Sequence, residues 1–100
     1  MRPIYLAHLD KTRPVVILTR AIIRPHMNRV SVAPITSAIR GLLTEVPVGQ
    51  ANGLDKASVV NCDNITTASV TDLLRRIGFL LPEQEAHLTA AIIAAYDLSV

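Results

Sequence analysis

The sequence has few aromatic residues and few of the side chains that build disulfides or metal sites. Of its 100 residues, three are aromatic and only Cys62 is a cysteine. A single cysteine excludes an internal disulfide and, without a CxxC pair, the common cysteine zinc sites. We expect Cys62 to be a small buried strand residue in a reducing compartment. His8, His26 and His87 show no ligand spacing, so we predict no metal site and no cofactor.

Other familiar motifs are missing too. The four glycines are isolated, so there is no glycine-rich phosphate loop. There is no GxSxG elbow and no carboxylate pairing typical of a glycosidase. No apolar run approaches the roughly 20 residues of a membrane-spanning helix, and the start, MRPIYLAHLDKTR, turns charged too early for a signal peptide. These absences predict one cytoplasmic domain over residues 1–100, with a core of Val, Ile, Leu and Ala.

Charge is unevenly spread along the chain. Residues 1–41 carry seven lysines and arginines against one aspartate, a net +6, whereas residues 42–100 carry three against seven carboxylates, a net −4. Their sum is the overall +2, and eight of the ten cationic residues are arginine. Arginine suits bidentate contacts to phosphate, so the basic half indicates a polyanionic partner. Pairing of the basic half with the acidic half explains the same pattern, and charge alone leaves both interpretations open.

Short apolar runs between turn signals predict a mainly β chain, with strands over residues 3–9, 14–18, 30–33, 44–48, 57–62 and 65–67. The first two form a hairpin, and Pro14 fits the first residue of its second strand. Pro34 is expected to end the pairing of the third strand, and Pro47 favours an edge position or a bulge for the fourth. Asn52-Gly53 is the strongest turn signal in the chain.

The last part of the chain is expected to be helical. Pro82 suits the first turn of a helix, and an apolar stripe at helical spacing follows in Leu88, Ile92, Ala95 and Tyr96. One or two helical turns are also expected over residues 71–77, capped by Thr71 or Ser69. The predicted fold class is mainly β with α+β additions: a small β-barrel with short helices and a C-terminal amphipathic helix.

Residues 34–40, PITSAIR, form a polar corner between two predicted strands. By elimination, arginine, threonine, serine and asparagine are the side chains left for chemistry. RNA is cleaved without a metal when its own 2′-OH attacks the adjacent phosphate, provided the site orients the sugar and neutralises the developing charge. An arginine side chain can neutralise that charge, and a threonine hydroxyl can hydrogen-bond the phosphate or orient the 2′-OH. Taken alone, Arg13 equally fits a surface charge at a strand end, and Thr36 a turn hydroxyl.

Three segments in sequence order, VAPITSAIRGLLTEVPV, NGLDKASVVNCDNI and RIGFLLPEQEAHLTAAIIAAYDL, preceded by RPVVI, resemble the MazF/PemK/Kid toxin ribonucleases. The resemblance covers nearly the whole chain. It implies an SH3-like β-barrel that is usually a homodimer. It also implies a metal-independent, sequence-specific endoribonuclease of a type II toxin–antitoxin system. Such an enzyme cuts single-stranded RNA, chiefly mRNA, to a 2′,3′-cyclic phosphate and a 5′-OH. A cognate antitoxin inhibits it with an extended acidic segment.

The same resemblance implies the site residues. The family's catalytic arginine falls on Arg13 and its catalytic threonine on Thr36. Arg13 would stabilise the charge of the phosphorane, and Thr36 would position the scissile phosphate or the 2′-OH. Arg40 is added because it lies beside the corner in the sequence. The predicted RNA-binding residues are then Ser37, Arg40, Asp63, Asn64 and Lys11.

Two departures from the family pattern affect the chemistry. The loop between the first two strands, usually longer, is cut to residues 10–12, which leaves the general base and the RNA sequence preference open. Asn61 stands where some members have an arginine. Two non-nuclease alternatives are a plain RNA-binding SH3-like module and a gyrase-poisoning toxin of the same fold. The gyrase alternative needs aromatic contacts at the end of the chain, and this chain has no tryptophan.

Overall fold

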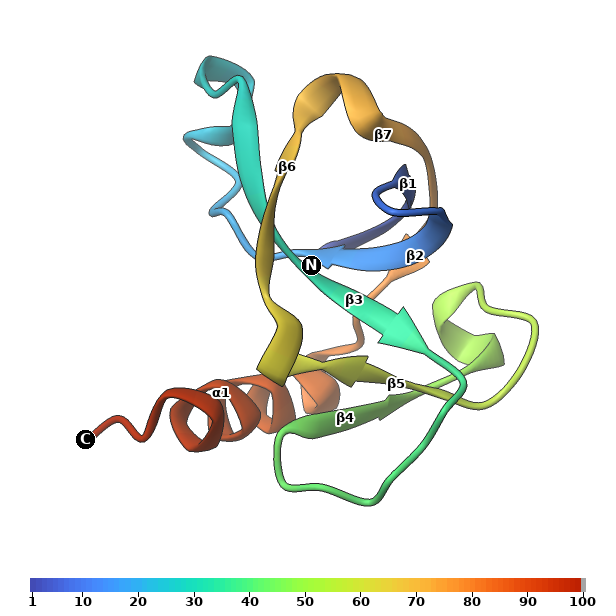
Figure 1. Ribbon diagram of the computed structural model, residues 1–100, viewed down its shortest axis with the longest axis vertical. Coiled ribbons are helices and arrows are strands. Elements are labelled where there is room, and N and C mark those ends of the chain that lie inside the picture. Colours follow the sequence, from blue (N-terminus) through green and yellow to red (C-terminus); the bar gives the residue numbers. More distant parts are fainter. Residues whose placement is uncertain (100) are drawn as a thin grey trace.

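The computed structural model describes residues 1–99, and it is dominated by a strongly bent antiparallel sheet with one helix packed across an open end (Figure 1). The path of hydrogen-bonded neighbours runs β4-β5-β3-β2-β1-β7, and β6 pairs with β3 off this path. The strands are β1 (Pro3–His8), β2 (Thr12–Ile17), β3 (Arg29–Thr36), β4 (Glu45–Val48), β5 (Ser58–Asn61), β6 (Thr66–Ser69) and β7 (Leu73–Phe79). The helix is α1 (Pro82–Tyr96), and the short 3-10 turns are η1 (Arg24–His26), η2 (Gln50–Asn52), η3 (Cys62–Asn64) and η4 (Val70–Asp72).

Strand β3 joins the two parts of this sheet because it pairs with three other strands. Its first half pairs with β6 and its end with β5, while β2 lies along its middle. The prediction that Pro34 ends the strand is wrong: Pro34 lies opposite Val15 inside the β2–β3 pairing. Pairing with β6 stops at Val32 and pairing with β5 starts at Ile35. Pro34 therefore falls where β3 changes partner, and its missing N–H costs no ladder hydrogen bond.

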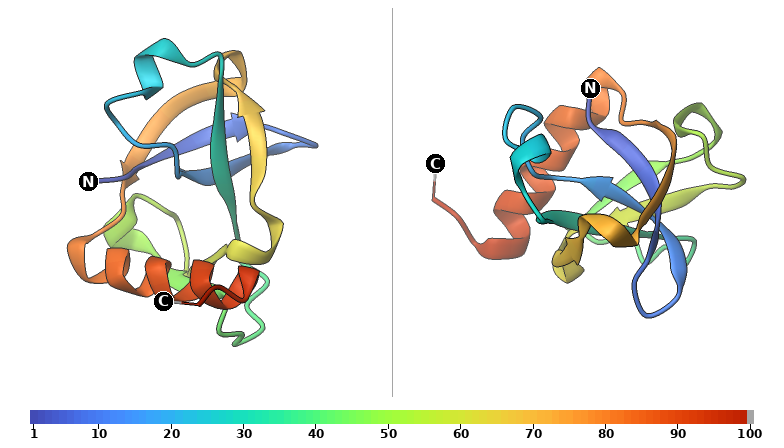
Figure 2. Two further views of the ribbon diagram at one scale, coloured as in Figure 1. Left: turned by 90° about the vertical axis from the view of Figure 1, so that its left-hand side faces the viewer. Right: turned by 90° about the horizontal axis from the view of Figure 1, so that it is seen from above.

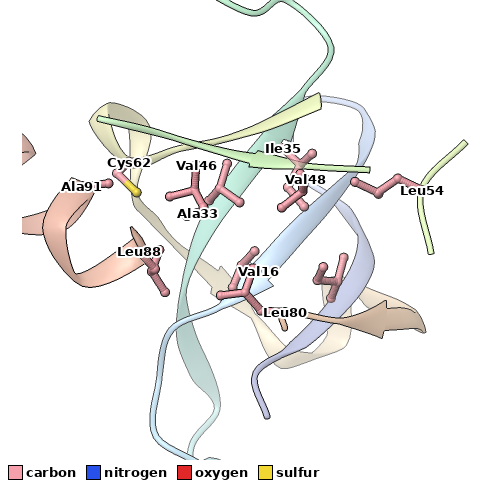
Figure 3. Close-up of a cluster of buried hydrophobic side chains, with 12 residues drawn as sticks. Val16, Ala33, Ile35, Val46, Val48, Leu54, Cys62, Leu80, Leu88 and Ala91 are labelled. Atoms are coloured by element: carbon pink, nitrogen blue, oxygen red, sulfur yellow. The ribbon is translucent and has the colours of Figure 1, made fainter. Parts of the chain in front are cut away.

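The aliphatic core lies between the sheet and the helix (Figure 3). Its central members, drawn together in that close-up, include Val16, Ala33, Ile35, Val46, Val48, Cys62, Leu80, Leu88 and Ala91. A second, smaller cluster includes Val15, Ile17 and Val32. Successive residues of β2 therefore enter different clusters, so both faces of this strand are buried. That explains its continuous β-branched run, which is typical of a central strand.

Strand β4 lies at one end of the sheet order, as the proline inside it predicts. Val46 and Val48 face the core while Pro47 is exposed. Helix α1 begins at Pro82, as expected. Leu88 is buried and Ile92 packs against the core, but Tyr96 is 54% exposed, so its assignment to the apolar stripe is wrong. The stripe ends at Ala95, which still packs against the core, one residue before the helix ends.

Residues 71–77 are not α-helical: Thr71 and Asp72 end the short 3-10 turn η4, and residues 73–77 lie in a strand. Ser69 does cap a 3-10 turn, since its hydroxyl accepts the Thr71 N–H at 3.4 Å, but the chain then enters strand β7. β7 pairs with β1, with Arg75 opposite Leu6 and Arg76 opposite Tyr5. The exposed edge of β1 supplies backbone partners far away in sequence, and this pairing overrides the weak local helix signal. The sheet therefore has seven strands where six were expected.

The turn after β4 packs tightly against β7 and brings the two ends of the sheet together. Gly53 has a φ of +88°, and a Cβ on it would overlap the Ile77 carbonyl; a Cβ on Gly78 would overlap the Asn52 carbonyl. Asn52 is buried, and its side-chain amide donates to the Phe79 carbonyl at 2.9 Å. Glycine is therefore required on both sides of this contact. The contact gives the bent sheet its barrel-like shape.

No helix within residues 1–99 is both long and apolar enough to cross a membrane.

Candidate active site

Two clefts meet at the side chains of Arg13 and Thr36, which line both of them. The first cleft has a volume of about 370 Å³ and the second about 170 Å³. They open where β2 begins and β3 ends, beside the turn that joins β1 to β2 (Figure 1). Residues from β2 and β3, together with others from β1, β4, β5, β7 and the connecting loops, thus line one polar surface.

Arg13 is held in place from one side only. It lies on β2 opposite Ala7, and its Nη2 donates to Oδ2 of Asp10 at 2.9 Å. Its side chain is 24% exposed, and its Nε is buried without an acceptor among residues 1–99. A guanidinium carries five N–H donors. Arg13 therefore keeps donors for an anion that enters the cleft.

Asp10 is ionised over the whole physiological pH range. Desolvation by the surrounding chain acts to raise the pKa of its carboxyl. The Lys11 backbone N–H and the positive charge of Arg13 outweigh this, so the pKa of Asp10 lies below its ordinary value. The carboxylate is therefore available to hold the Arg13 guanidinium at any pH at which RNA would be cleaved.

Thr36 is the last residue of β3, opposite Val59 of β5. Its Oγ1 accepts the Ala38 N–H at 3.1 Å, which fixes the direction of the hydroxyl. Within the described part of the chain, nothing accepts the hydroxyl proton. Thr36 can therefore donate that proton to an oxygen in the cleft.

The predicted RNA-binding residues are divided between the clefts, with one exception. Lys11 and Ser37 line the first cleft, while Arg40 and Asn64 line the second. Asp63 lines neither. Its Oδ2 accepts the Thr44 hydroxyl at 2.6 Å, and its own backbone N–H donates to Oδ1 of Asn61. In this structure Asp63 shapes the η3 turn.

Sequence reasoning missed two cations of the first cleft, Lys56 and Arg75. Both belong to the half of the chain with negative net charge, where no basic site was sought. Lys56 follows the Asn52-Gly53 turn, and Arg75 with Arg76 is the only basic pair after residue 41. Asn61, noted only as a departure from the family pattern, lines the second cleft.

The electrostatics of the first cleft favour a polyanion. Its lining includes four cationic residues, Lys11, Arg13, Lys56 and Arg75, and one carboxylate, Asp55. No group of three or more histidine, cysteine, aspartate or glutamate residues that could hold a metal ion occurs within residues 1–99. These cations are suited to binding successive phosphates of a nucleic acid.

The loop over residues 37–43 forms the wall between the polar clefts and a third groove. Glu45 anchors it: this carboxylate is only 5% exposed and accepts the backbone N–H groups of Arg40, Gly41 and Leu42 at 2.8 to 3.3 Å. Three N–H donors around one carboxylate form an anion nest. One buried side chain thus sets the shape of the whole loop.

The third groove, about 450 Å³, is mainly apolar. It lies between the loop and α1, and its lining includes Ile39, Leu42, Leu43, Ala90 and Ala94. Leu43 is 85% exposed and Ile39 is 53% exposed. Exposed large aliphatic side chains side by side mark a surface for contact with another protein.

Cys62 is excluded as the nucleophile. It is buried in the core cluster, as expected from the sequence, but it begins the η3 turn and does not lie in a strand as predicted. Desolvation by burial, with a smaller contribution from the Asp63 carboxylate, raises the pKa of its thiol to about 11. The thiol is therefore neutral at physiological pH and lies away from the clefts.

Comparison with known proteins gives a consistent result. A family model described as PemK-like, MazF-like toxin of type II toxin-antitoxin system matches residues 3–96. Endoribonuclease MazF3 of Mycobacterium tuberculosis (strain ATCC 25618 / H37Rv) is 59% identical over 98 residues, which cover 98% of this chain and 95% of the relative.

Solved structures agree with that match. Mycobacterium tuberculosis toxin MazF-mt6 superposes with a TM-score of 0.97 at 57% identity and covers 99% of this chain and 100% of its own. An endoribonuclease from a mycobacterial species, solved in complex with its cognate antitoxin, superposes with a TM-score of 0.87. At 24% identity, with 98% of this chain and 94% of its own covered, the second similarity shows the fold alone. The predicted barrel is confirmed.

Proposed function

Because this chain belongs to the PemK-like, MazF-like toxins of type II toxin–antitoxin systems, and is an endoribonuclease, we propose how it cleaves RNA. The substrate is single-stranded RNA, chiefly mRNA, cut at short specific sequences. The 2′-OH attacks the adjacent phosphorus, the 5′-oxygen leaves, and the products are a 2′,3′-cyclic phosphate and a 5′-OH. The observation that carries this proposal is that Arg13 and Thr36, distant in sequence, line the same two clefts.

Arg13 neutralises the negative charge that builds up on the phosphoryl oxygens in the transition state. Asp10 holds its Nη2, so the guanidinium is oriented before substrate binds. Donors that are already oriented stabilise the phosphorane without the cost of reorganisation. This charge comes from a side chain, which is why we propose that cleavage needs no metal ion.

Thr36 positions the reacting phosphate. Its hydroxyl accepts from Ala38 and can donate to a phosphate oxygen or to the 2′-OH. The attack is already intramolecular, and holding the 2′-oxygen in line with the bond that breaks selects the reactive conformation of the RNA. Thr36 therefore orients the reacting groups, and Arg13 stabilises the negative charge that develops.

The RNA backbone passes through the first cleft and past Arg13 and Thr36, which line both clefts, into the second. Lys11, Lys56 and Arg75 bind phosphates in the first cleft, with Ser37 at its edge. Arg40 and Asn64 contact the strand in the second cleft. We keep Asp63 as a proposed contact through Oδ1 of its carboxylate, because Oδ2 accepts from Thr44 and the backbone N–H donates to Asn61.

We also propose a homodimer and a cognate antitoxin, both in the cytoplasm. The apolar groove beside α1 supports the dimer, because a second copy would cover Ile39, Leu42 and Leu43. The cationic clefts support an extended acidic antitoxin segment, which would exclude RNA by occupying its phosphate sites.

The test is cleavage of a long single-stranded RNA by the parent protein and by Arg13→Ala and Thr36→Ala, mapped by primer extension. We expect Arg13→Ala to lose about 10²- to 10³-fold in rate, Thr36→Ala to lose somewhat less, and EDTA to leave the parent rate unchanged. Parent-like cleavage by both variants would disprove the site. RNA binding without cleavage by the parent would instead support a non-catalytic module.

A further inference from the structure

A second basic surface lies on the other side of the barrel from the clefts. The connection between β2 and β3, residues 18–28, passes the start of α1 and encloses a cavity of about 420 Å³ there. Figures 1 and 2 show this connection, coloured light blue to cyan, well away from the β1–β2 turn that borders the clefts. We call this the arginine cavity, because Arg2, Arg20 and Arg24 line it.

The arginines of this cavity are not neutralised by their surroundings. Its one carboxylate, Glu85, is taken by Arg2, whose Nε lies 2.6 Å from Oε1. Arg2 also donates to the Leu18 carbonyl at 2.7 Å, so its role is structural. Within residues 1–99, neither Arg20 nor Arg24 forms an ion pair. Two positive charges of this cavity therefore remain available to an anion.

Arg24 also carries an unsatisfied donor. Its Nε is buried and has no acceptor among the described residues. A buried N–H without a partner has a cost in stability. A rotation of the side chain that brings this donor to a carboxylate recovers that cost. The only other side-chain atom of the described residues in this condition is Nε of Arg13, in the clefts.

An apolar groove adjoins the arginine cavity. Its lining shares Thr19 and Arg20 with the cavity and adds Leu18, Ile23 and Met27. Beside it, Ile22 is 82% exposed and Met27 is 42% exposed. An apolar groove next to unpaired cations suits a protein segment that carries both carboxylates and apolar side chains.

We infer that this surface binds an acidic peptide segment that carries apolar side chains. Its carboxylates pair with Arg20 and Arg24, and its apolar side chains enter the groove between Leu18 and Met27. The site is separate from the RNA clefts and needs none of their residues. A protein partner bound there would leave the clefts open.

The test uses a fluorescein-labelled peptide of glutamates and leucines, with fluorescence anisotropy as the readout. We expect Arg20→Glu with Arg24→Glu to weaken binding roughly tenfold or more, since charge-assisted hydrogen bonds are lost and replaced by repulsion. The clefts are themselves proposed to hold an acidic segment, so the reference protein and every variant in this titration carry Lys56→Glu, which weakens that competing site. Arg76→Glu is the control for charge, because Arg76 lines neither the arginine cavity nor the apolar groove, and we expect less than a twofold effect. Made alone, the double substitution should leave the rate of RNA cleavage unchanged, which separates this inference from the proposed cleavage mechanism.

A second measurement does not depend on how well the double variant folds. In the ¹⁵N-labelled parent protein, the Nε–Hε signal of Arg24, identified by its loss in Arg24→Gln, should shift on adding the peptide. A peptide whose binding is weakened by Arg76→Glu as much as by the double substitution would overturn the inference. An unmoved Arg24 signal at saturation would also overturn it, as would an oligouridylate that binds there while the peptide does not.

Discussion

The loop over residues 37–43 has two unlike sides. On one side Ser37 and Arg40 face clefts that also contain Arg13, where cations outnumber carboxylates. On the other side Leu42 and Leu43 face the groove along α1, which is mainly apolar. Both sides are built on one support, the buried carboxylate of Glu45. The residues that we propose for chemistry and those that we propose for subunit contact therefore share a single backbone conformation.

The comparison teaches that substitutions in this region fall into two classes. A change in a side chain that lines one hollow should alter that hollow alone. A change in the support should alter both, because the three N–H groups that Glu45 binds belong to the loop backbone. The predictions below separate the two classes, starting from the largest expected effect.

Glu45→Ala should damage both sides of the loop. Removing the carboxylate leaves three N–H donors without their acceptor, and we expect the free energy of unfolding to fall by about 3 kcal/mol. Cleavage and self-association should weaken together at temperatures where the variant is folded. Urea denaturation, RNA cleavage and sedimentation measure the three effects.

Two variants control this experiment. Glu45→Gln keeps one acceptor oxygen and should be milder on every measure. Glu85→Ala removes a partly exposed carboxylate paired with Arg2 and should cost less than about 1 kcal/mol. If Glu45→Ala loses stability but keeps full cleavage and self-association, the two sides of the loop are independent.

Ionisation of the buried Cys62 thiol should lower the free energy of unfolding at high pH. Burial raises the pKa of this thiol from 9.0 to about 11, so between these values the unfolded chain loses the proton while the folded chain keeps it. The unfolded state then binds fewer protons, and stability falls as pH rises, by about 2–3 kcal/mol across the window. Urea denaturation from pH 8 to 11 should show a smaller fall in Cys62→Ala than in the parent. Equal falls in the two proteins would contradict the assignment of this pH dependence to Cys62.

Leu43→Glu should act on the apolar side only. A charge placed on this 85% exposed side chain would be buried in the proposed dimer, and we expect the dissociation constant of the dimer to rise at least about 30-fold. Unfolding of the monomer should be unchanged. Leu74→Glu is the matched control, since Leu74 is exposed on β7 outside the groove. Sedimentation that shows equal effects of both changes would move the dimer contact elsewhere.

Arg75→Ala should act on the polar side only, with the smallest effect. We expect KM for RNA to rise about fivefold with little change in kcat, because one phosphate contact is lost without touching the reacting atoms. The slope of log affinity against log salt should fall by about 0.7. Arg76→Ala is the control: its guanidinium stacks over Phe79 at 4.7 Å and lines neither cleft. Equal loss in both variants would argue for a general charge effect.

The candidate site could be predicted in part from the sequence. Arg13 and Thr36 were found through the family resemblance, and the structure brings them to the same clefts. Lys56 and Arg75 were missed because their roles depend on closure of the barrel, which no local pattern records. Asp63 was included for its motif, although its carboxylate is bound by a hydroxyl 19 positions earlier in the chain.

By itself the sequence determined the local elements and the family. The β-branched run of β2, the Asn52-Gly53 turn and the proline at the start of α1 act through neighbouring residues, so periodicity and turn chemistry reveal them. Only the tertiary structure decided that residues 73–79 form a strand, that Glu45 is buried and that four cations share a cleft. Each of these depends on backbone groups and charges distant in sequence, which meet only when the bent sheet brings its two ends together at Gly53 and Gly78.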